Sequence, residues 1–139
     1  MANYPHLTFE PHNERDWFAA LAALARYLRT PEGCPWDREQ TAADFARHLQ
    51  GEVDELREAL DGADAHAVEE EFGDTLFTLL ATAAAAEEAG DFNFERALQA
   101  IHDKMIRRHG HVFGDEKAET PEDAVRVWNA AKEAERKQP

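Results

Sequence analysis

The sequence predicts an all-α fold, and three features of its 139 residues support that class. Hydrophobic residues make up 43% of the chain, which is enough to form a core. Alanine is abundant and β-branched residues are few, a composition that favours helices. No run alternates apolar and polar residues as a half-buried strand does. The length suits a single domain, 1–139, with an extended arm over 1–13 and a helical region over 14–136.

Local signals place the first helix and a loop after it. Asn13 is a typical N-cap, and the helix should stop near Thr30-Pro31, because the residue before a proline avoids the helical region. Its predicted core face consists of apolar residues at helical spacing, Trp17, Leu21, Leu24 and Leu28. Two prolines and a glycine predict a loop over 31–40. Within this loop Trp36 either covers the core or offers a platform to a flat ligand.

Two long helices are expected in the middle of the chain. A capping box at Thr41 begins the second helix, which Asp61-Gly62 ends. The third helix runs from about 64 to 89, with Gly90 as its stop. Beyond residue 74 this helix is apolar nearly all round, which predicts burial against more than one neighbour. In so short a chain, the second neighbour would be a partner subunit.

Two more helices complete the predicted bundle. Asn93 caps the fourth, which runs to about 109 with core positions Leu98, Ile101 and Met105. After a predicted loop over 109–115, Thr120 and Pro121 begin the fifth. On this last helix Trp128 and Lys132 are spaced i, i+4, which puts a ring and a cation side by side.

Charge and cysteine content exclude several classes of partner. The formal net charge of −14 argues against stable nucleic-acid binding, which needs a basic surface. The one cysteine, Cys34, allows no intrachain disulfide and agrees with a cytoplasmic location. No basic region followed by an apolar run begins the chain, so no signal peptide is expected. The longest apolar stretch is too short to span a bilayer, so no membrane partner is expected.

Four acidic residues carry the chemistry that the sequence suggests. Glu52 and Glu55 are spaced i, i+3 on the second helix, and Glu71 and Asp74 on the third, so each pair shares one helix face. Glu52 also stands in a seam otherwise filled by apolar residues, where a carboxylate is unexpected. Four carboxylates brought together need a counter-charge, and oxygen ligands suit a hard cation. We therefore predict a Mg²⁺ site, which Mn²⁺ could also occupy.

Three interpretations of this acidic group compete. A solvated run of charge is the plainest, but the seam position of Glu52 weakens it. A di-iron carboxylate bundle needs Glu-x-x-His pairs, and none of the seven histidines has a glutamate three residues before it. A Mg²⁺-dependent hydrolase of phosphoanhydrides fits oxygen-only ligation, with water as the attacking group. The cations near the end of the fourth helix, Lys104, Arg107 and Arg108, could then hold phosphates, although they could also simply offset the helix dipole.

A series of short runs strengthens the third interpretation. In order they are Gly33-Cys34-Pro35-Trp36-Asp37 with Gln40-Thr41, Glu52-x-x-Glu55, Glu71-x-x-Asp74, Lys104-x-x-Arg107-Arg108-His109, His111-Val112-Phe113-Gly114-Asp115, and Trp128 with Lys132. Any one run is weak, but their order and spacing together resemble the MazG nucleotide pyrophosphohydrolases.

This resemblance implies a fold, a reaction and a site. It implies a bundle of the all-α NTP pyrophosphatase type, with a four-helix core and about five helices, assembled as a homodimer or homotetramer. It implies Mg²⁺-dependent hydrolysis of nucleoside triphosphates to monophosphates and pyrophosphate, in house-cleaning of nucleotide pools. The metal ligands and catalytic residues would be Glu52, Glu55, Glu71 and Asp74, and the substrate-binding residues Trp36, Lys104, Arg107, Arg108, Trp128 and Lys132.

The chain departs from the family pattern at one position that matters for activity. The motif is usually written Glu-Glu-x-x-Glu, and Gly51 takes the place of its first acid. Related dCTP pyrophosphatases also lack that acid and keep the next two. The departure keeps a second hypothesis open, a non-catalytic nucleotide-binding or regulatory module. A third hypothesis is an acidic helical interaction protein that uses no nucleotide.

Overall fold

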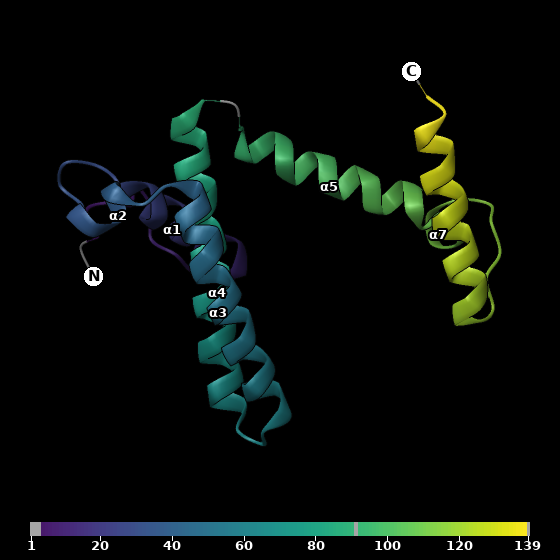
Figure 1. Cartoon of the computed structure of the whole chain (residues 1–139), viewed down its shortest axis with the longest axis horizontal. Helices are drawn as coiled ribbons and strands as arrows, with labels where there is room; N and C mark the ends of the chain where they lie inside the picture. The colour runs from purple at the N-terminus through teal and green to yellow at the C-terminus, as the bar shows by residue number, and fades with distance from the viewer. Residues whose placement is uncertain (1–3, 91, 139) are drawn as a thin grey trace. The chain divides into compact units, whose positions relative to one another are not determined.

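The computed structural model describes residues 4–90 and 92–138, and their regular elements are all helices (Figure 1). In chain order these helices are α1 (Glu14–Tyr27), α2 (Pro35–Glu39), α3 (Ala42–Asp61), α4 (Ala65–Ala89), α5 (Phe94–Arg108), α6 (Gly110–Phe113) and α7 (Pro121–Arg136). The all-α prediction is therefore confirmed. The chain divides into two compact units, Met1–Phe92 and Asn93–Pro139. The prediction of one domain over the whole chain stays a prediction.

The helix starts follow the capping residues that the sequence supplies. The side chains of Asn13, Thr41, Asn93 and Thr120 each accept a hydrogen bond from a backbone N–H in the first turn of their helix. At Thr41 the capping box is complete, because Asp44 also accepts from the Thr41 backbone. Gly90 ends α4 in the left-handed conformation, with φ of 105°. No described helix is long and apolar enough to cross a membrane.

Two segments predicted as loops each contain a short helix, so those two predictions are wrong. Pro35 is the first residue of α2, a position where a missing N–H costs nothing. The side-chain amide of Gln40 donates to the Trp36 carbonyl, and its backbone N–H donates to the Asp37 carbonyl. In the second segment, the N–H groups of Val112 and Phe113 both donate to the His109 carbonyl and begin α6. Proline and glycine, which predicted loops, here mark the ends of short helices.

The first unit is organised around α3 and α4, which lie side by side, with α1 packed against α4 (Figure 1). One buried cluster consists of Phe45 from α3 with Ala81 and Ala85 from α4. Alanine at these positions lets the helix axes approach closely, since little side chain stands between them. The apolar second half of α4 thus supplies the core of this unit.

Several residues predicted to be core are exposed. Trp17 is 52% exposed, and the buried residues of α1 are Ala20 and Ala25. Trp17 lines a groove of about 220 Å³ beside the N-terminal arm. Leu98 and Ile101 of α5 are 44% and 48% exposed. Helical spacing correctly identified the apolar faces, but it did not show which of them would be covered.

The turn between α1 and α2 has room only for glycine at position 33. A Cβ built on Gly33 would lie 2.3 Å from the carbonyl oxygen of Leu28 and 2.5 Å from that of Tyr27. The backbone cannot yield easily there, because the N–H of Cys34 donates to the Leu28 carbonyl over 2.8 Å. We expect Gly33→Ala to lower the free energy of unfolding by about 1–3 kcal/mol, as overpacking does. Urea denaturation followed by circular dichroism would measure this, and Gly51→Ala, whose Cβ meets nothing within 4 Å, is the control.

Candidate functional site

Three of the four predicted acidic residues form a close group where α3 lies against α4. One carboxylate oxygen from each of Glu52, Glu55 and Glu71 lies within 4.8 Å of the other two. We call these three residues the acidic cluster. Asp74 is outside this group of three, although its charge acts on both Glu52 and Glu71. The structure therefore brings the complete pair of α3 together with Glu71 of α4, and Asp74 acts on Glu52 and Glu71 through its charge.

The hydroxyl group of Thr75 on α4 forms a hydrogen bond to α3 beside the acidic cluster. The Thr75 hydroxyl lies 2.8 Å from the Glu71 carbonyl oxygen on its own helix. It also lies 3.2 Å from the Glu52 carbonyl oxygen on α3. A shared donor of this kind fixes the height of Glu52 relative to Glu71. The positions of the carboxylates thus follow from the helix pairing and not from flexible side chains alone.

The acidic cluster is electrostatically strained. Burial raises the pKa of the Glu52 carboxyl, and a hydrogen bond and the negative charge of Glu55 raise it further. Burial also raises the pKa of Glu71, followed by the charge of Glu55. The imidazole of His48 acts in the opposite direction on the Glu52 pKa. Glu55 and, more weakly, Asp74 thus act on both partly buried carboxyls.

Two carboxylate oxygens without hydrogen-bond partners indicate whether a cation fits the acidic cluster. The Oε2 atoms of Glu52 and Glu71 are buried and accept no hydrogen bond. Buried polar atoms nearly always have a hydrogen-bond partner, so two unpaired carboxylate oxygens in one cluster indicate that a bound ligand supplies their partner. Oxygen-only donors suit Mg²⁺ or Mn²⁺ and do not suit softer metals. The residues present therefore fit the divalent cation that the sequence predicts.

Space is open beside the cluster at the position of the missing acid. Gly51 precedes Glu52 on α3, and a Cβ built there would meet nothing within 4 Å. The glycine is therefore not required by crowding at its Cβ position.

An exposed aromatic pair lies one helical turn from the cluster. Trp36 on α2 is 51% exposed and contacts the ring of His48, with centroids 5.4 Å apart. Its edge meets the buried ring of Phe45 at 6.0 Å. His48 precedes Glu52 by four residues on α3, a spacing of about 6 Å along the helix. Trp36 thus packs against a core residue and leaves about half of its surface open.

The predicted substrate-binding cations lie in the second unit, and two of them have acidic partners there. Arg108 is 9% exposed, and its guanidinium donates to Glu135 over 2.9 Å. Arg107 donates to the other oxygen of the same carboxylate over 3.1 Å. The hydrogen bond from Arg108 lowers the pKa of Glu135, and the one from Arg107 lowers it further. A phosphate held by these arginines would share them with Glu135.

The other predicted substrate-binding residues of this unit, Lys104, Lys132 and Trp128, have no acidic partner of this kind in the described part of the chain. Lys104 is half-buried and Lys132 is exposed. Neither forms an ion pair with a carboxylate among residues 4–90 and 92–138. The cation over the Trp128 ring is the guanidinium of Arg108, 4.8 Å from the ring centre. Trp128 also faces an open cleft of about 340 Å³, whose other lining residues are Arg108, His109, His111, Ala124 and Val125.

Three residues near these places were not singled out from the sequence. Glu135 lies seven residues after Trp128, so helical spacing could have placed it on the same face. His48 lies four residues before Glu52, which is also a readable signal. Arg29 donates to the backbone carbonyls of Asp37 and Gln40, eight and eleven residues further along the chain, and no helical spacing connects them.

Comparisons with known proteins identify the family. The model of the MazG nucleotide pyrophosphohydrolase domain matches residues 40–113, more than half of the chain. The nucleoside triphosphate pyrophosphohydrolase of Escherichia coli K12 is 40% identical over 85% of the chain, which spans 45% of that protein. The nucleoside triphosphate pyrophosphohydrolase/pyrophosphatase MazG of Thermotoga maritima is 38% identical, with 86% and 45% covered.

A solved structure supports the same assignment. The crystal structure of a mazG-related protein from Thermotoga maritima superposes with a TM-score of 0.70 and is 30% identical. The match covers 84% of this chain and 98% of that one. The chain spans less than half the length of the two curated relatives above. Sequence motifs, helical architecture and all three comparisons agree, and the chain belongs to the MazG nucleotide pyrophosphohydrolase family.

Proposed function

We propose that this chain is a nucleoside triphosphate pyrophosphohydrolase, which converts NTP or dNTP and water to the monophosphate and pyrophosphate. The observation that supports this best is the acidic cluster with its two buried, unpaired oxygens. The curated relatives whose names state this activity support the same reaction. House-cleaning of nucleotide pools, in a reducing cytoplasm, is the role that we propose for it.

Glu52, Glu55 and Glu71 would hold Mg²⁺ or Mn²⁺, with Asp74 beside them as a fourth carboxylate. When bound, such a cation neutralises phosphate charge and lowers the pKa of water. The protein side chains would orient the polyphosphate across α3 and α4 and accept the proton of the attacking water on a carboxylate oxygen. Water is the proposed attacking group.

The cations of the second unit would hold the outer phosphates. Lys104, Arg107, Arg108 and Lys132 are the proposed ligands of these oxygens, since Arg and Lys are the usual phosphate donors in proteins. Trp128 would pack against the nucleotide beside Arg108. In the structure both Arg107 and Arg108 are paired with Glu135, so an anion would share them with that carboxylate.

A homodimer or homotetramer is the proposed assembly. Phe72 and Leu79 are 58% and 51% exposed and are seven residues apart on α4. That spacing puts both on one face of the helix, apart from the buried Leu80 and Ala84. Large apolar side chains gathered on one face suit a partner subunit, as the all-round apolar character of α4 predicts.

A second candidate is a catalytically inactive nucleotide-binding module of the same fold. Two observations favour it: Gly51 removes one carboxylate, and Glu135 occupies Arg107 and Arg108. The two candidates differ in turnover and not in binding. The third hypothesis, an interaction protein without nucleotide, differs from both because no triphosphate would bind.

One experiment separates the three. We expect a panel of canonical, deoxy and oxidised NTPs, assayed with Mg²⁺ and Mn²⁺, to yield monophosphate and pyrophosphate in equal amounts. Calorimetric binding of NTP with no product would instead support the inactive module. If no NTP shifts the melting temperature, and mutation of Lys104 and Arg108 changes nothing, the interaction protein is supported.

A further inference from the structure

We propose that Arg29 is a positioning residue for substrate recognition, which holds α2 so that Trp36 and His48 together receive the nucleobase of the substrate. This inference rests on the proposed function, because it concerns the base end of the same triphosphate. It assigns to Arg29 and His48 a role in selecting the ligand, and it makes a short helix of the first unit a recognition element.

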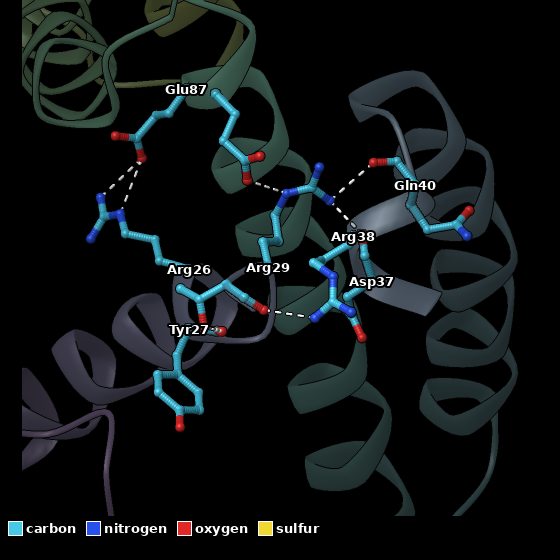
Figure 2. Close-up of polar contacts among 9 residues, drawn as sticks. Arg26, Tyr27, Arg29, Asp37, Arg38, Gln40 and Glu87 are labelled. Carbon is cyan, nitrogen blue, oxygen red and sulfur yellow. Dashed lines mark hydrogen bonds and ion pairs between the residues drawn. The ribbon is translucent and has the colours of Figure 1, made fainter. Parts of the chain in front are cut away.

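The side chain of Arg29 joins three elements of the first unit (Figure 2). It is 9% exposed, and its guanidinium pairs with the carboxylate of Glu88 on α4. One of its nitrogens also donates to the carbonyls of Asp37 and Gln40, the latter over 2.9 Å. The guanidinium lies 6.0 Å from the centre of the Phe45 ring on α3. A nearly buried arginine with this many partners is a fixed part of the structure.

These contacts are what stabilises α2. A helix of five residues is too short to persist by itself, because nucleation is costly and few bonds reward it. The carbonyl of Asp37 in α2 accepts the backbone N–H of the C-cap residue Gln40, and one nitrogen of Arg29 donates to this carbonyl and to that of Gln40. Arg38 donates in return to the carbonyl of Thr30 over 2.8 Å, as Figure 2 shows. The place of α2 is therefore set by arginine bonds to backbone oxygens.

The position of α2 decides the position of Trp36. Its ring contacts Phe45 edge-on at 76° and His48 at 52°, and about half of the residue stays exposed. An open indole beside an imidazole offers a flat apolar surface together with a nitrogen that can bond to a base edge. His48 stands one helical turn before Glu52, so a nucleotide stacked here would direct its phosphates toward the acidic cluster.

Loss of this support should weaken binding of the base and leave the chemistry intact. We expect Arg29→Met to raise KM for NTP about tenfold with kcat unchanged, the scale of one lost base stack. Trp36→Leu and His48→Leu should raise KM in the same way. The double variant Arg29→Met/Trp36→Leu should be no worse than Trp36→Leu alone, because Arg29 acts through Trp36.

Inorganic tripolyphosphate, which has no base, is the discriminating probe. Its inhibition constant against NTP hydrolysis should stay unchanged in Arg29→Met, because the phosphate end of the site is intact. Arg26→Met is the matched control, since Arg26 also links α1 to α4, through Glu87 (Figure 2). It is expected to lower the melting temperature slightly and to leave KM unchanged.

The result that would overturn the inference is an equal loss of tripolyphosphate and NTP affinity in Arg29→Met, or an unchanged KM in all three single variants. If Arg29→Met does not fold, Trp36→Leu and His48→Leu test whether these two side chains bind the base. Arg29→Lys then tests whether Arg29 positions α2. If the wild-type protein binds NTP without hydrolysis, calorimetric dissociation constants replace KM. Failure of the wild-type protein to bind any NTP would instead overturn the proposed function itself.

Discussion

Replacing Glu55 with Gln is expected to lower pyrophosphate release by about 100-fold or more while α3 and α4 stay folded. Glu55 is a shared neighbour of Glu52 and Glu71, so it contributes to the negative field at both. Stabilisation of transition-state charge by a bound cation amounts to several kcal/mol, and each 1.36 kcal/mol is tenfold in rate, so loss of about 2.7 kcal/mol gives this factor. Asp74→Asn is expected to act in the same direction. The measurement is pyrophosphate release at saturating NTP and Mg²⁺.

Glu58→Gln is the matched control for this substitution. Glu58 is an exposed acid on the same helix, three residues beyond Glu55, and it is not part of the acidic cluster. Its replacement should leave kcat and KM unchanged. Circular dichroism should show equal helicity in all three variants. Full Mg²⁺-dependent activity in both Glu55→Gln and Asp74→Asn would show that the active site lies elsewhere.

The second large effect concerns stability and divalent cations. Adding Mg²⁺ at a hundred times its dissociation constant is expected to stabilise the protein by about 2.7 kcal/mol, the amount that follows from ligand linkage. The physical reason is that a cation relieves repulsion among Glu52, Glu55 and Glu71. The double variant Glu52→Gln/Glu71→Gln should lose this response. It should also melt at a higher temperature than the wild-type protein when no metal is present.

The pH dependence gives this prediction a definite sign. Folding raises the pKa of Glu52 and of Glu71, so the folded protein binds more protons than the unfolded chain. Below the ordinary carboxyl pKa of about 4.3 both carboxyls are protonated in the folded and the unfolded protein, so they do not lower the free energy of unfolding. As the pH rises from there through their raised folded-state pKa, they lower the free energy of unfolding increasingly. Metal-free stability should fall over that interval in the wild-type protein, and fall less in the double variant.

Thermal melting from pH 4 to pH 8, with and without Mg²⁺, measures both effects. Glu69→Gln/Glu70→Gln, a pair of exposed acids on α4, controls for the general removal of negative charge. This control should keep the Mg²⁺ response and the slope with pH. An identical Mg²⁺ response in Glu52→Gln/Glu71→Gln would mean that the cation binds outside the acidic cluster.

Local chemistry explains why much of the fold could be predicted from the sequence. The N-caps at Asn13, Thr41, Asn93 and Thr120 each bond within their own first turn, so the start of a helix needs no distant partner. Short-range rules failed where a helix depends on distant contacts. The helix α2 was predicted as a loop because its stability comes from Arg29, which no local pattern connects to it.

Exposure was the other property that local patterns could not supply. An i, i+3, i+4 pattern shows which face of a helix is apolar, and it correctly marked the faces of Trp17 and of Leu98. Whether such a face is covered depends on what else packs there, and both residues remain substantially exposed. Partner subunits are the proposed cover for the face of α4 that carries Phe72 and Leu79.

By itself the sequence determined the helical class, the helix starts and the two acidic pairs, because caps and i, i+3 spacing are properties of a single helix. Only the tertiary structure decided that Glu52, Glu55 and Glu71 come within 4.8 Å, with two oxygens left unpaired. It also decided that Arg107 and Arg108 pair with Glu135, that Arg29 donates to the carbonyls of Asp37 and Gln40, and that Trp36 stays half exposed. These are contacts between helices, and their geometry depends on how whole helices pack, which spacing along one chain does not encode.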